Sequence, residues 1–400
     1  MKPVYVIGTC DTKDAELRYA ARCITQAGAA VVLVDISTGS SRAQADVTPA
    51  MVASHHPDGA AAVLGQSDRG LAVSAMAKAL SSYLATRHDI GAVLGLGGGG
   101  NTAMVTAAMR TLPIGVPKLM VSTMASGNVA PYVGPTDIMM MYTVADIAGM
   151  NTITRAVIGN AANAAAGMAL NAAPVTSSEK PAVGLTMFGV TTPAVTELRR
   201  LIGDSWECFV FHATGTGGQC MEKLVDSGLL AAIVDLTTTE IADHLFGGVL
   251  PCTDDRLGAV IRKGIPWLGS VGAVDMINFG APDTVPERHA GRKLHSHNPQ
   301  VTLMRTTEAE NSAIGSWLVA RINQMTGPAS LLLPLRGVSA LDAPGEPFHD
   351  PAADQALFAA IRSNWHAKPN HRLLEIDAHI NDATFAEACT KEFQAMTTGA

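Results

Sequence analysis

The sequence predicts an α/β protein made of two Rossmann-like, doubly wound lobes whose sheets are mainly parallel. Continuously apolar, strand-like segments alternate with helix-like segments, and this alternation stops once near the middle of the chain and then begins again. Strands of this kind are typical of parallel sheets covered by helices on both faces. The length of 400 residues also favours two domains, because single hydrophobic cores stop growing well below that size.

The first half of the chain contains five strand-like segments and four helix-like segments. The expected strands are Val4–Ile7, Ala30–Asp35, Gly91–Leu96, Pro117–Ser122 and Asp137–Thr143. The expected helices are Asp14–Ala27, Gly70–Thr86, Asn101–Arg110 and Asn151–Leu170. The order of these segments predicts one βα lobe over residues 1–175.

A small, polar segment, Asn171–Lys180, interrupts the pattern and carries a proline, so the domain boundary is expected there. The second lobe is expected over residues 180–400. Its predicted strands are Pro181–Met187, Glu207–Phe211, Ala231–Asp235, Ile265–Gly269, Val301–Arg305, Leu331–Leu335 and Leu373–Asp377.

Composition and charge exclude several classes of partner. The formal net charge is −7 and no basic run exceeds two residues, which argues against nucleic acid and anionic membranes as partners. Neither a signal peptide nor an apolar run of membrane-spanning length is apparent. The six scattered cysteines contain no CxxC pair and suit free thiols in a reducing compartment. We therefore expect a cytoplasmic protein.

The clearest functional motif is a run of four glycines between an apolar strand and a helix. Such a turn leaves backbone amides free to bind an anion at the helix N-terminus. It lacks the Gly-Lys-Ser/Thr ending of a P-loop and the acidic residue that completes a dinucleotide fingerprint. The alternative is a tight packing turn. The predicted nucleotide-binding residues here are Gly97, Gly98, Gly99, Gly100, Asn101 and Thr102.

Two further loops leave strands of the same lobe and are expected to meet the glycine loop at the carboxyl edge of the sheet. The first carries Asp11, Thr12 and Lys13, whose ammonium can reach a phosphate. Helix capping alone would also explain Asp11 or Thr12. The second carries Ser122 and Thr123, whose hydroxyls suit either a polar pocket floor or ordinary turn capping.

The second lobe has its own candidate anion site. A loop of glycines and threonines again joins a strand to a helix, and Arg305 is expected to close a strand whose end lies on the same sheet edge. His295 and His297 form an HxH that suits a metal or proton transfer, although loop histidines without such a role are commoner and no zinc spacing accompanies them. The loop residues of this second anion site are Thr214, Gly215, Thr216, Gly217 and Gly218.

The same segments resemble a known family over nearly the whole chain. The chain is similar to the Tm-like ATP-binding family, which includes the N-terminal inhibitory domain of a plant protein that gives resistance against tomato mosaic virus, together with many bacterial and fungal members. The resemblance rests on seven blocks: Ile7–Lys13, Gly95–Thr102, Leu112–Gly127, Asp137–Asn151, Phe211–Leu224, Gly291–Thr307 and Gly337–Pro351.

This resemblance implies two Rossmann-like subdomains, a homodimer, and ATP, with or without Mg²⁺, bound in the first lobe. The apolar segments Met139–Met141 and Met150–Leu170 are the expected dimer surface. An alternative remains open, in which the chain is a metabolic enzyme that acts on a small carboxylate or phosphosugar held between the lobes. The antiviral role of the plant member depends on its own surface and is not expected here.

Overall fold

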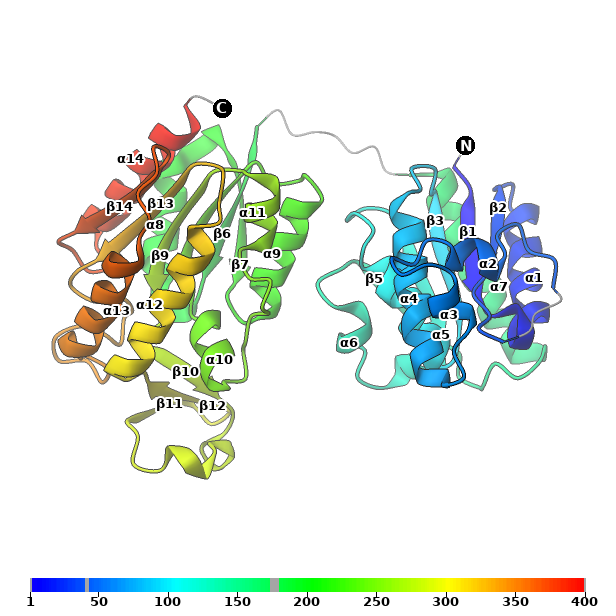
Figure 1. Cartoon of the computed structure of the whole chain (residues 1–400), viewed down its shortest axis with the longest axis horizontal. Coiled ribbons are helices and arrows are strands. Elements are labelled where there is room, and N and C mark those ends of the chain that lie inside the picture. Colours follow the sequence, from blue (N-terminus) through cyan, green and yellow to red (C-terminus); the bar gives the residue numbers. More distant parts are fainter. Residues whose placement is uncertain (1, 40–42, 173–179, 399–400) are drawn as a thin grey trace. The chain divides into compact units, whose positions relative to one another are not determined.

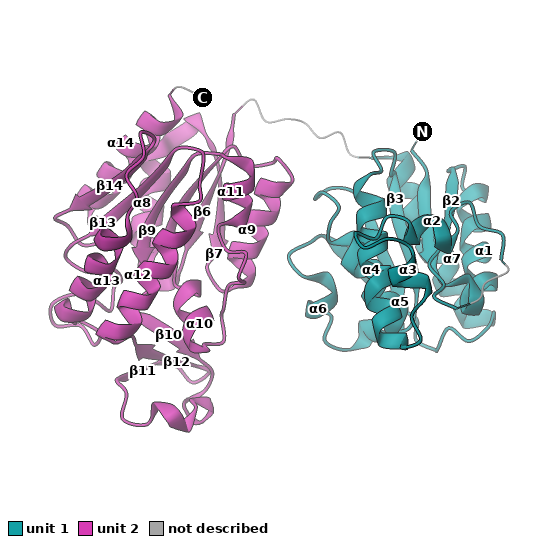
Figure 2. Cartoon of the chain, viewed as in Figure 1, with its two compact units in different colours: residues 1–176 teal, residues 177–400 magenta. Residues whose placement is uncertain are grey.

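The computed structural model describes residues 2–39, 43–172 and 180–398. The chain divides into two compact units, residues 1–176 and 177–400, which Figure 2 shows in separate colours. The boundary expected between residues 175 and 180 falls within residues 173–179, outside the described residues. Each unit has its own sheet and its own hydrophobic cores.

Unit 1 alternates strands and helices in the expected order (Figure 1). Its strands are β1 (Val4–Gly8), β2 (Val31–Asp35), β3 (Ala92–Gly97), β4 (Lys118–Ser122) and β5 (Ile138–Tyr142). Its helices are α1 (Cys10–Gln26), α2 (Pro49–Ala53), α3 (Ala61–Leu64), α4 (Arg69–Ala85), α5 (Gly99–Met109), α6 (Ala130–Val133) and α7 (Thr152–Leu170).

The sheet of unit 1 is parallel throughout and has the strand order β2-β1-β3-β4-β5. Successive residues of a strand face opposite sides of the sheet. Tyr5 and Ile7 of β1 accordingly join the core formed with α4 and α5. Val4 and Val6 join the core formed with α1 and α7. Both faces are therefore covered, as the apolar strand segments predict.

Unit 2 contains more strands because its parallel sheet has six of them and the described chain also forms a separate three-stranded antiparallel sheet (Figure 1). Its strands are β6 (Ala182–Met187), β7 (Glu207–His212), β8 (Ala232–Thr237), β9 (Trp267–Gly272), β10 (Met276–Phe279), β11 (Leu294–Asn298), β12 (Val301–Arg305), β13 (Ala329–Pro334) and β14 (His371–Ile376). Its helices are α8 (Thr192–Ile202), α9 (Thr216–Asp226), α10 (Glu240–Phe246), α11 (Gly258–Lys263), α12 (Glu308–Ile322), α13 (Pro351–Asn364) and α14 (Ala383–Thr397).

The parallel sheet of unit 2 has the order β14-β13-β9-β8-β6-β7. The first strand of the unit, β6, therefore lies between the second and third, β7 and β8, just as β1 lies between β2 and β3 in unit 1. One face packs on a core that includes α9, α12 and α13, and the other face packs on α8 and α14. The prediction of two doubly wound, mainly parallel lobes is confirmed.

One predicted strand belongs to a different sheet from the one expected. Val301–Arg305 forms β12, but it pairs antiparallel with β10 and β11 in a separate three-stranded sheet. The expectation that Arg305 ends at the same sheet edge as the loop after β7 is therefore wrong. An apolar run of five residues fits either kind of sheet, and the partners of a strand depend on distant residues.

No helix among the described residues has both the length and the apolar character needed to cross a lipid bilayer.

Candidate functional site

A cavity of about 480 Å³ lies where the loops after β1, β2 and β3 meet the start of α4 in unit 1. This volume falls within the range of about 300–1,000 Å³ that is typical of small-molecule sites. The residues that line it are Thr9, Asp11, Thr12, Lys13, Thr38, Gly39, Arg69, Val73, Gly98, Gly99, Gly100, Asn101, Met104 and Asp146. Two loops far apart in the sequence, after β1 and β3, thus line one cavity.

The strand order explains this position. The chain runs from β1 outward to β2 on one side and returns to add β3 on the other side. Loops that leave the carboxyl ends of two such neighbouring strands diverge and open a crevice between them, where ligands of doubly wound sheets bind. The cavity in unit 1 occupies this switch point between β1 and β3.

The glycine loop presents bare amides to this cavity. Helix α5 begins at Gly99, and the amide of Thr102 bonds to the carbonyl of Gly98 at 2.9 Å. The amides of Gly99, Gly100 and Asn101 find no acceptor among the described residues, as is usual for the first turn of a helix. Such amides, together with the helix dipole, form an anion site.

Packing explains only the first of the four glycines. Gly97 has a φ of +154°, and a Cβ there would collide with Asn101. A Cβ on Gly98 or Gly99 would make only ordinary contacts, at 3.7 Å from Thr123 Oγ1 and Met124 Sδ respectively. A Cβ on Gly100 would meet nothing within 4 Å. The tight-turn alternative therefore accounts for Gly97 and leaves the other three glycines unexplained.

Several predicted ligand residues instead hold the loops together. Asn101 Nδ2 donates to Thr9 Oγ1 at 3.0 Å, which joins the loop after β3 to the loop after β1. The hydroxyls of Thr102 and Ser122 are fully buried and lie 2.6 Å apart. Gly97, Thr102, Ser122 and Thr123 are not among the residues that line the cavity. We therefore assign Thr102 and Ser122 to loop support.

The charges around the cavity are balanced. Lys13 and Arg69 supply two cations, and Asp11 and Asp146 supply two carboxylates. The Lys13 ammonium donates to the carbonyl of Ile147, which ties α1 to the segment after β5. Arg69 and Asp146 were not predicted from the sequence as residues of this site. A cation in the first turn of a helix, where the dipole disfavours it, is a local signal that could have pointed to Arg69.

A larger cavity of about 600 Å³ lies between α1 and the edge strand β2. Its lining comes from α1 and β2, through side chains such as Arg22, Thr25 and Val31, and from residues 44–46 in the segment after β2, and it includes none of the glycine-loop residues. Because it lacks the bare amides, we place the candidate site in the smaller cavity.

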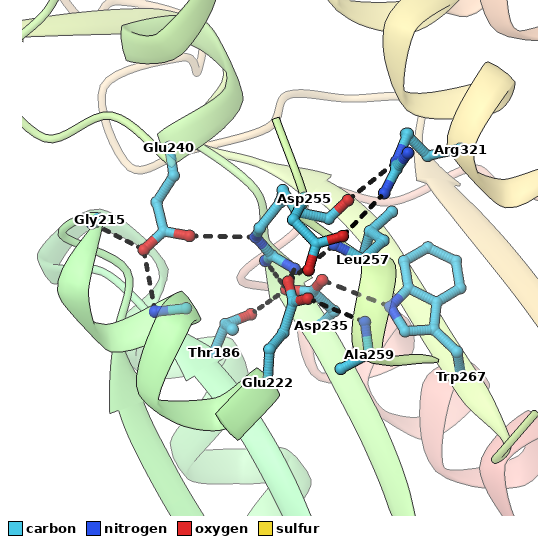
Figure 3. A network of polar contacts seen from close by, with 12 residues as sticks. Thr186, Gly215, Glu222, Asp235, Glu240, Asp255, Leu257, Ala259, Trp267 and Arg321 are labelled. Carbon is cyan, nitrogen blue, oxygen red and sulfur yellow. Dashed lines mark hydrogen bonds and ion pairs between the residues drawn. The ribbon is translucent and has the colours of Figure 1, made fainter. Parts of the chain in front are cut away.

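The glycine loop of unit 2 already holds an anion that belongs to the protein. Glu240 Oε1 accepts hydrogen bonds from the amides of Gly215 and Gly218, at 2.7 and 3.1 Å (Figure 3). The Glu240 side chain is fully buried, and a Cβ on Gly218 would collide with it. The prediction of an external anion on Thr214–Gly218 is therefore corrected, because an internal carboxylate occupies two of the loop amides.

Glu240 is part of a buried ionic network around Arg256 (Figure 3). The Arg256 guanidinium contacts Glu240, Glu222 and Asp235 at 3.1, 3.2 and 2.8 Å. Burial raises the pKa of Glu222 and Glu240, and the charge of Arg256 opposes this rise. Burial opposes the charge of Arg256 itself, yet its three partners hold its pKa well above the ordinary value.

Arg305 is likewise engaged inside unit 2. Its guanidinium donates to the carbonyl of Phe348 at 2.7 Å and to Asp354 Oδ1 at 2.9 Å, and only 4% of the residue is exposed. The suggestion that Arg305 grips a ligand together with the Gly215–Gly218 loop is therefore corrected. Arg305 anchors buried carboxylates instead.

The HxH segment forms the edge strand β11, where His295 packs edge-on against Phe348 and His297 is exposed. The pairing register slips between Ser296 and Asn298, so the regular alternation that would place both imidazoles on one face is interrupted at His297. Among the described residues, no group of three or more His, Cys, Asp or Glu side chains is arranged to hold a metal ion.

Fold and site together define a protein of two doubly wound α/β units, the first of which carries an open polar cavity at its switch point. The chain belongs to the family described as uncharacterised protein family UPF0261. The N-terminal domain of that family matches residues 2–174, and its C-terminal domain matches residues 180–397.

Relatives of this chain occur in bacteria and in a plant. A UPF0261 protein of Rhizobium meliloti (strain 1021) is 53% identical over 98% of this chain and 99% of its own. A UPF0261 protein of Clostridium tetani is 40% identical over 98% of each chain. The tomato mosaic virus resistance protein Tm-1(GCR237) of Solanum lycopersicum is 40% identical over 98% of this chain, which spans 55% of the plant protein.

Replacing Arg256 with methionine leaves three buried carboxylates without their cation. We expect Arg256→Met to lower the free energy of unfolding of unit 2 by about 3–5 kcal/mol. Urea denaturation followed by tryptophan fluorescence measures this selectively, because all four tryptophans lie in unit 2. Arg262→Met is the matched control: its pairs with Asp226 and Asp255 are exposed, so a loss of at most about 1 kcal/mol is expected. Equal losses in both variants would contradict a dominant role for the buried network.

Proposed function

We propose that unit 1 binds a nucleotide, and specifically ATP, with its phosphates on the glycine loop. The observation that carries this proposal is the set of unpartnered amides of Gly99, Gly100 and Asn101 at the wall of a cavity that also contains Lys13 and Arg69. Amides at a helix N-terminus and nearby cations are the groups that hold phosphates in other nucleotide-binding proteins. The choice of ATP rests on the family resemblance of the same loops.

The acidic residues at this cavity fit a nucleotide that carries Mg²⁺. Magnesium is usually held by one or two carboxylates together with the phosphates of the substrate. Asp11 and Asp146 both line the cavity and supply such oxygens. Without a metal ion, these two carboxylates would offset the attraction of Lys13 and Arg69 for a polyphosphate, so we propose that ATP binds as its magnesium complex.

ATP with Mg²⁺ is expected to raise the melting temperature of the chain, and Gly98→Val is expected to abolish this effect. At about 100 times its dissociation constant, ligand adds roughly 2.7 kcal/mol of stability. The valine fits the fold, because Gly98 has a φ of −85° and its Cβ would lie 3.7 Å from the nearest atom. Its methyl groups would nevertheless keep a phosphate from the amides. Differential scanning fluorimetry measures both effects.

Gly189→Val in unit 2 is the control for this experiment. Like Gly98, Gly189 follows a strand of the parallel sheet, here β6, and a Cβ there would meet nothing within 4 Å. The control should keep the full thermal shift. If no nucleotide in a millimolar panel shifts the melting temperature of the unmodified chain, the proposal is wrong.

The Arg69 guanidinium is expected to strengthen phosphate binding through its charge. Arg69→Ala should weaken ATP binding by about 1.5–3 kcal/mol, the usual contribution of a hydrogen bond to a charged group. The loss should shrink as salt is added. Lys78→Ala removes an exposed cation farther along α4 and should leave the affinity unchanged. Isothermal titration at two salt concentrations tests this. Equal losses of affinity in both variants would show that Arg69 acts only through the net charge of the protein and does not contact the phosphates.

We also propose that the chain forms a homodimer through strand β5. Met139 and Tyr142 on this edge strand are each 42% exposed, and Val144 beyond it is 64% exposed. Apolar side chains on an open strand edge favour pairing with another chain. The second expected surface, Met150–Leu170, stays a prediction: α7 buries one face, including Ala161 and Ala165, in the core of unit 1, and Ile153 on the same helix is 49% exposed.

Light scattering at micromolar concentration should therefore give twice the chain mass of 41.5 kDa. Met139→Lys places a charge on the open edge and should shift the particle to the monomer mass. Met51→Lys changes another half-exposed methionine, on α2, and should leave the dimer intact. A monomer mass for the unmodified chain would rule the dimer out.

A further inference from the structure

Unit 2 contains a cavity of about 580 Å³ at the carboxyl ends of β13 and β14, away from the glycine loop after β7. Its walls come from the segment that joins β13 to α13, from the first turn of α13, and from the loop after β14. The residues that line it are Leu335, Arg336, Ala343, Pro344, His349, Pro351, Asp354, Gln355, His379 and Asp382. Much of this lining lies in Gly337–Pro351, a block that marks the family resemblance and to which the proposed function gives no role.

The segment after β13 is held in a defined conformation. Gly337 has a φ of +125°, and a Cβ there would collide with the carbonyl oxygen of Asp342. The Asp342 carboxylate accepts a hydrogen bond from the amide of Val338 at 3.0 Å. Phe348 is fully buried against Leu303 and Met276. These constraints pre-form the cavity wall.

Three buried carboxylates lie near Arg305, and one of them, Asp354, lines this cavity, whereas Asp342 and Asp275 lie behind its lining. Asp354 is 6% exposed, and both Asp354 and Asp342 contact the same guanidinium nitrogen of Arg305, at 2.9 and 3.6 Å. Asp275, also fully buried, accepts a hydrogen bond from Ser339 at 2.7 Å. Its other oxygen has no partner among the described residues. Three carboxylates therefore share one cation.

The remaining polar groups of the lining do not supply the missing positive charge. Arg336 is paired with Asp377 by two bonds of 2.7 Å, and Asp382 adds another carboxylate. His379 accepts from the amide of Asn381 at Nδ1 and lies 2.9 Å from the Ser339 carbonyl at Nε2, an arrangement that suits the neutral ring. The buried Nδ1 of His349 has no partner in the described part of the chain. Gln355 brings an amide that can donate or accept, but no described residue of the lining brings an unpaired positive charge.

Protons compensate for part of this excess charge near neutral pH. Burial raises the pKa of Asp354 to about 8, and the neighbouring charge of Asp342 adds to the rise. Burial likewise raises the pKa of Asp275 to about 7. A cation that binds beside Asp354 would replace its proton, because the carboxylate would then have a second partner of opposite charge.

We propose that this cavity binds a small organic cation, a protonated amine, with the Asp354 carboxylate as its partner. An ammonium supplies an unpaired positive charge together with hydrogen-bond donors for the Asp354 carboxylate. A carboxylate or phosphate ligand, in contrast, would meet like charges there. A metal ion fits less well, since no group of three or more metal-ligating side chains is arranged to hold one among the described residues.

The test uses putrescine as the probe, with butanediol and succinate as the neutral and anionic molecules of matched length. Isothermal titration of the full chain should show saturable binding of putrescine alone. Repeating the titration in buffers of different ionisation enthalpy should show the release of up to one proton per bound molecule at pH 7. The affinity should rise from pH 6 to pH 8, because binding requires that Asp354 lose its proton.

Two variants and a control assign the binding to this cavity. Asp354→Asn should weaken putrescine binding roughly tenfold or more and abolish the proton release. Ala343→Trp should block the cavity without removing a buried carboxylate. Glu375→Gln changes an exposed carboxylate on β14 that pairs with Arg362 outside the cavity, and it should bind like the unmodified chain.

Several outcomes would overturn the proposal. These are the absence of putrescine binding, equal binding of butanediol or succinate, binding without proton release, and full affinity in Ala343→Trp. If Asp354→Asn fails to fold, the proton release and the Ala343→Trp variant decide the question. None of these measurements involves a nucleotide, so they remain distinct from the tests of unit 1.

Discussion

A backbone amide at the carboxyl edge of a parallel sheet needs an acceptor, and the two units meet this need in opposite ways. In unit 2, Glu240 reaches from α10 and accepts from Gly215 and Gly218. In unit 1, no carboxylate fills the corresponding role for Gly99 and Gly100 among the described residues. The amides of the glycine loop are therefore bonded to a carboxylate of the protein in unit 2, whereas in unit 1 they face an open cavity. The difference depends on one buried side chain that the glycine loops themselves do not reveal.

The two switch points can be compared directly, because β6 and β8 correspond to β1 and β3, whereas the glycine loop of unit 2 follows β7, the counterpart of β2. In unit 2 the switch point lies between β6 and β8, and threonines close it: Thr191 and Thr237 are 2.8 Å apart, and Thr186 donates to Asp235 at 2.7 Å. All four side chains are fully buried. A ligand cannot enter between these strands unless the hydroxyls separate. The open cavity of unit 2 lies instead at β13 and β14, farther along the sheet, where no equivalent of the threonine pairs is present in the described lining.

The sequence predicts the sheets, the order of elements and the meeting of the loops after β1 and β3, because strand burial and the geometry of parallel sheets are local and general. The sequence does not predict that β12 belongs to the antiparallel sheet, since an apolar run such as Val301–Arg305 fits a parallel or an antiparallel sheet equally well. Nor does the sequence predict which residue forms an ion pair with a given charged side chain. Arg305 looked free for a ligand, yet its carboxylate partner lies 49 residues away on α13. Long-range pairing of charges is decided by the folded core, which no short motif encodes.

Unit 2 buries two arginines, and each is surrounded by more carboxylates than one guanidinium can neutralise. Around Arg256, backbone amides donate further hydrogen bonds to the carboxylates: Glu222 accepts from Leu257 and Ala259, and Glu240 accepts from two glycines. Around Arg305, Asp275 Oδ1 has no partner among the described residues, and Asp342 Oδ1 has the 3.6 Å ion pair with Arg305 but no hydrogen bond. Burying an unsatisfied carboxylate is costly, and the cost falls if a proton or a cation is supplied. The first cluster is complete by itself, whereas the second lies beside a cavity through which a cation can enter. We therefore assign a structural role to Arg256 and a ligand-dependent role to the carboxylates that Arg305 anchors.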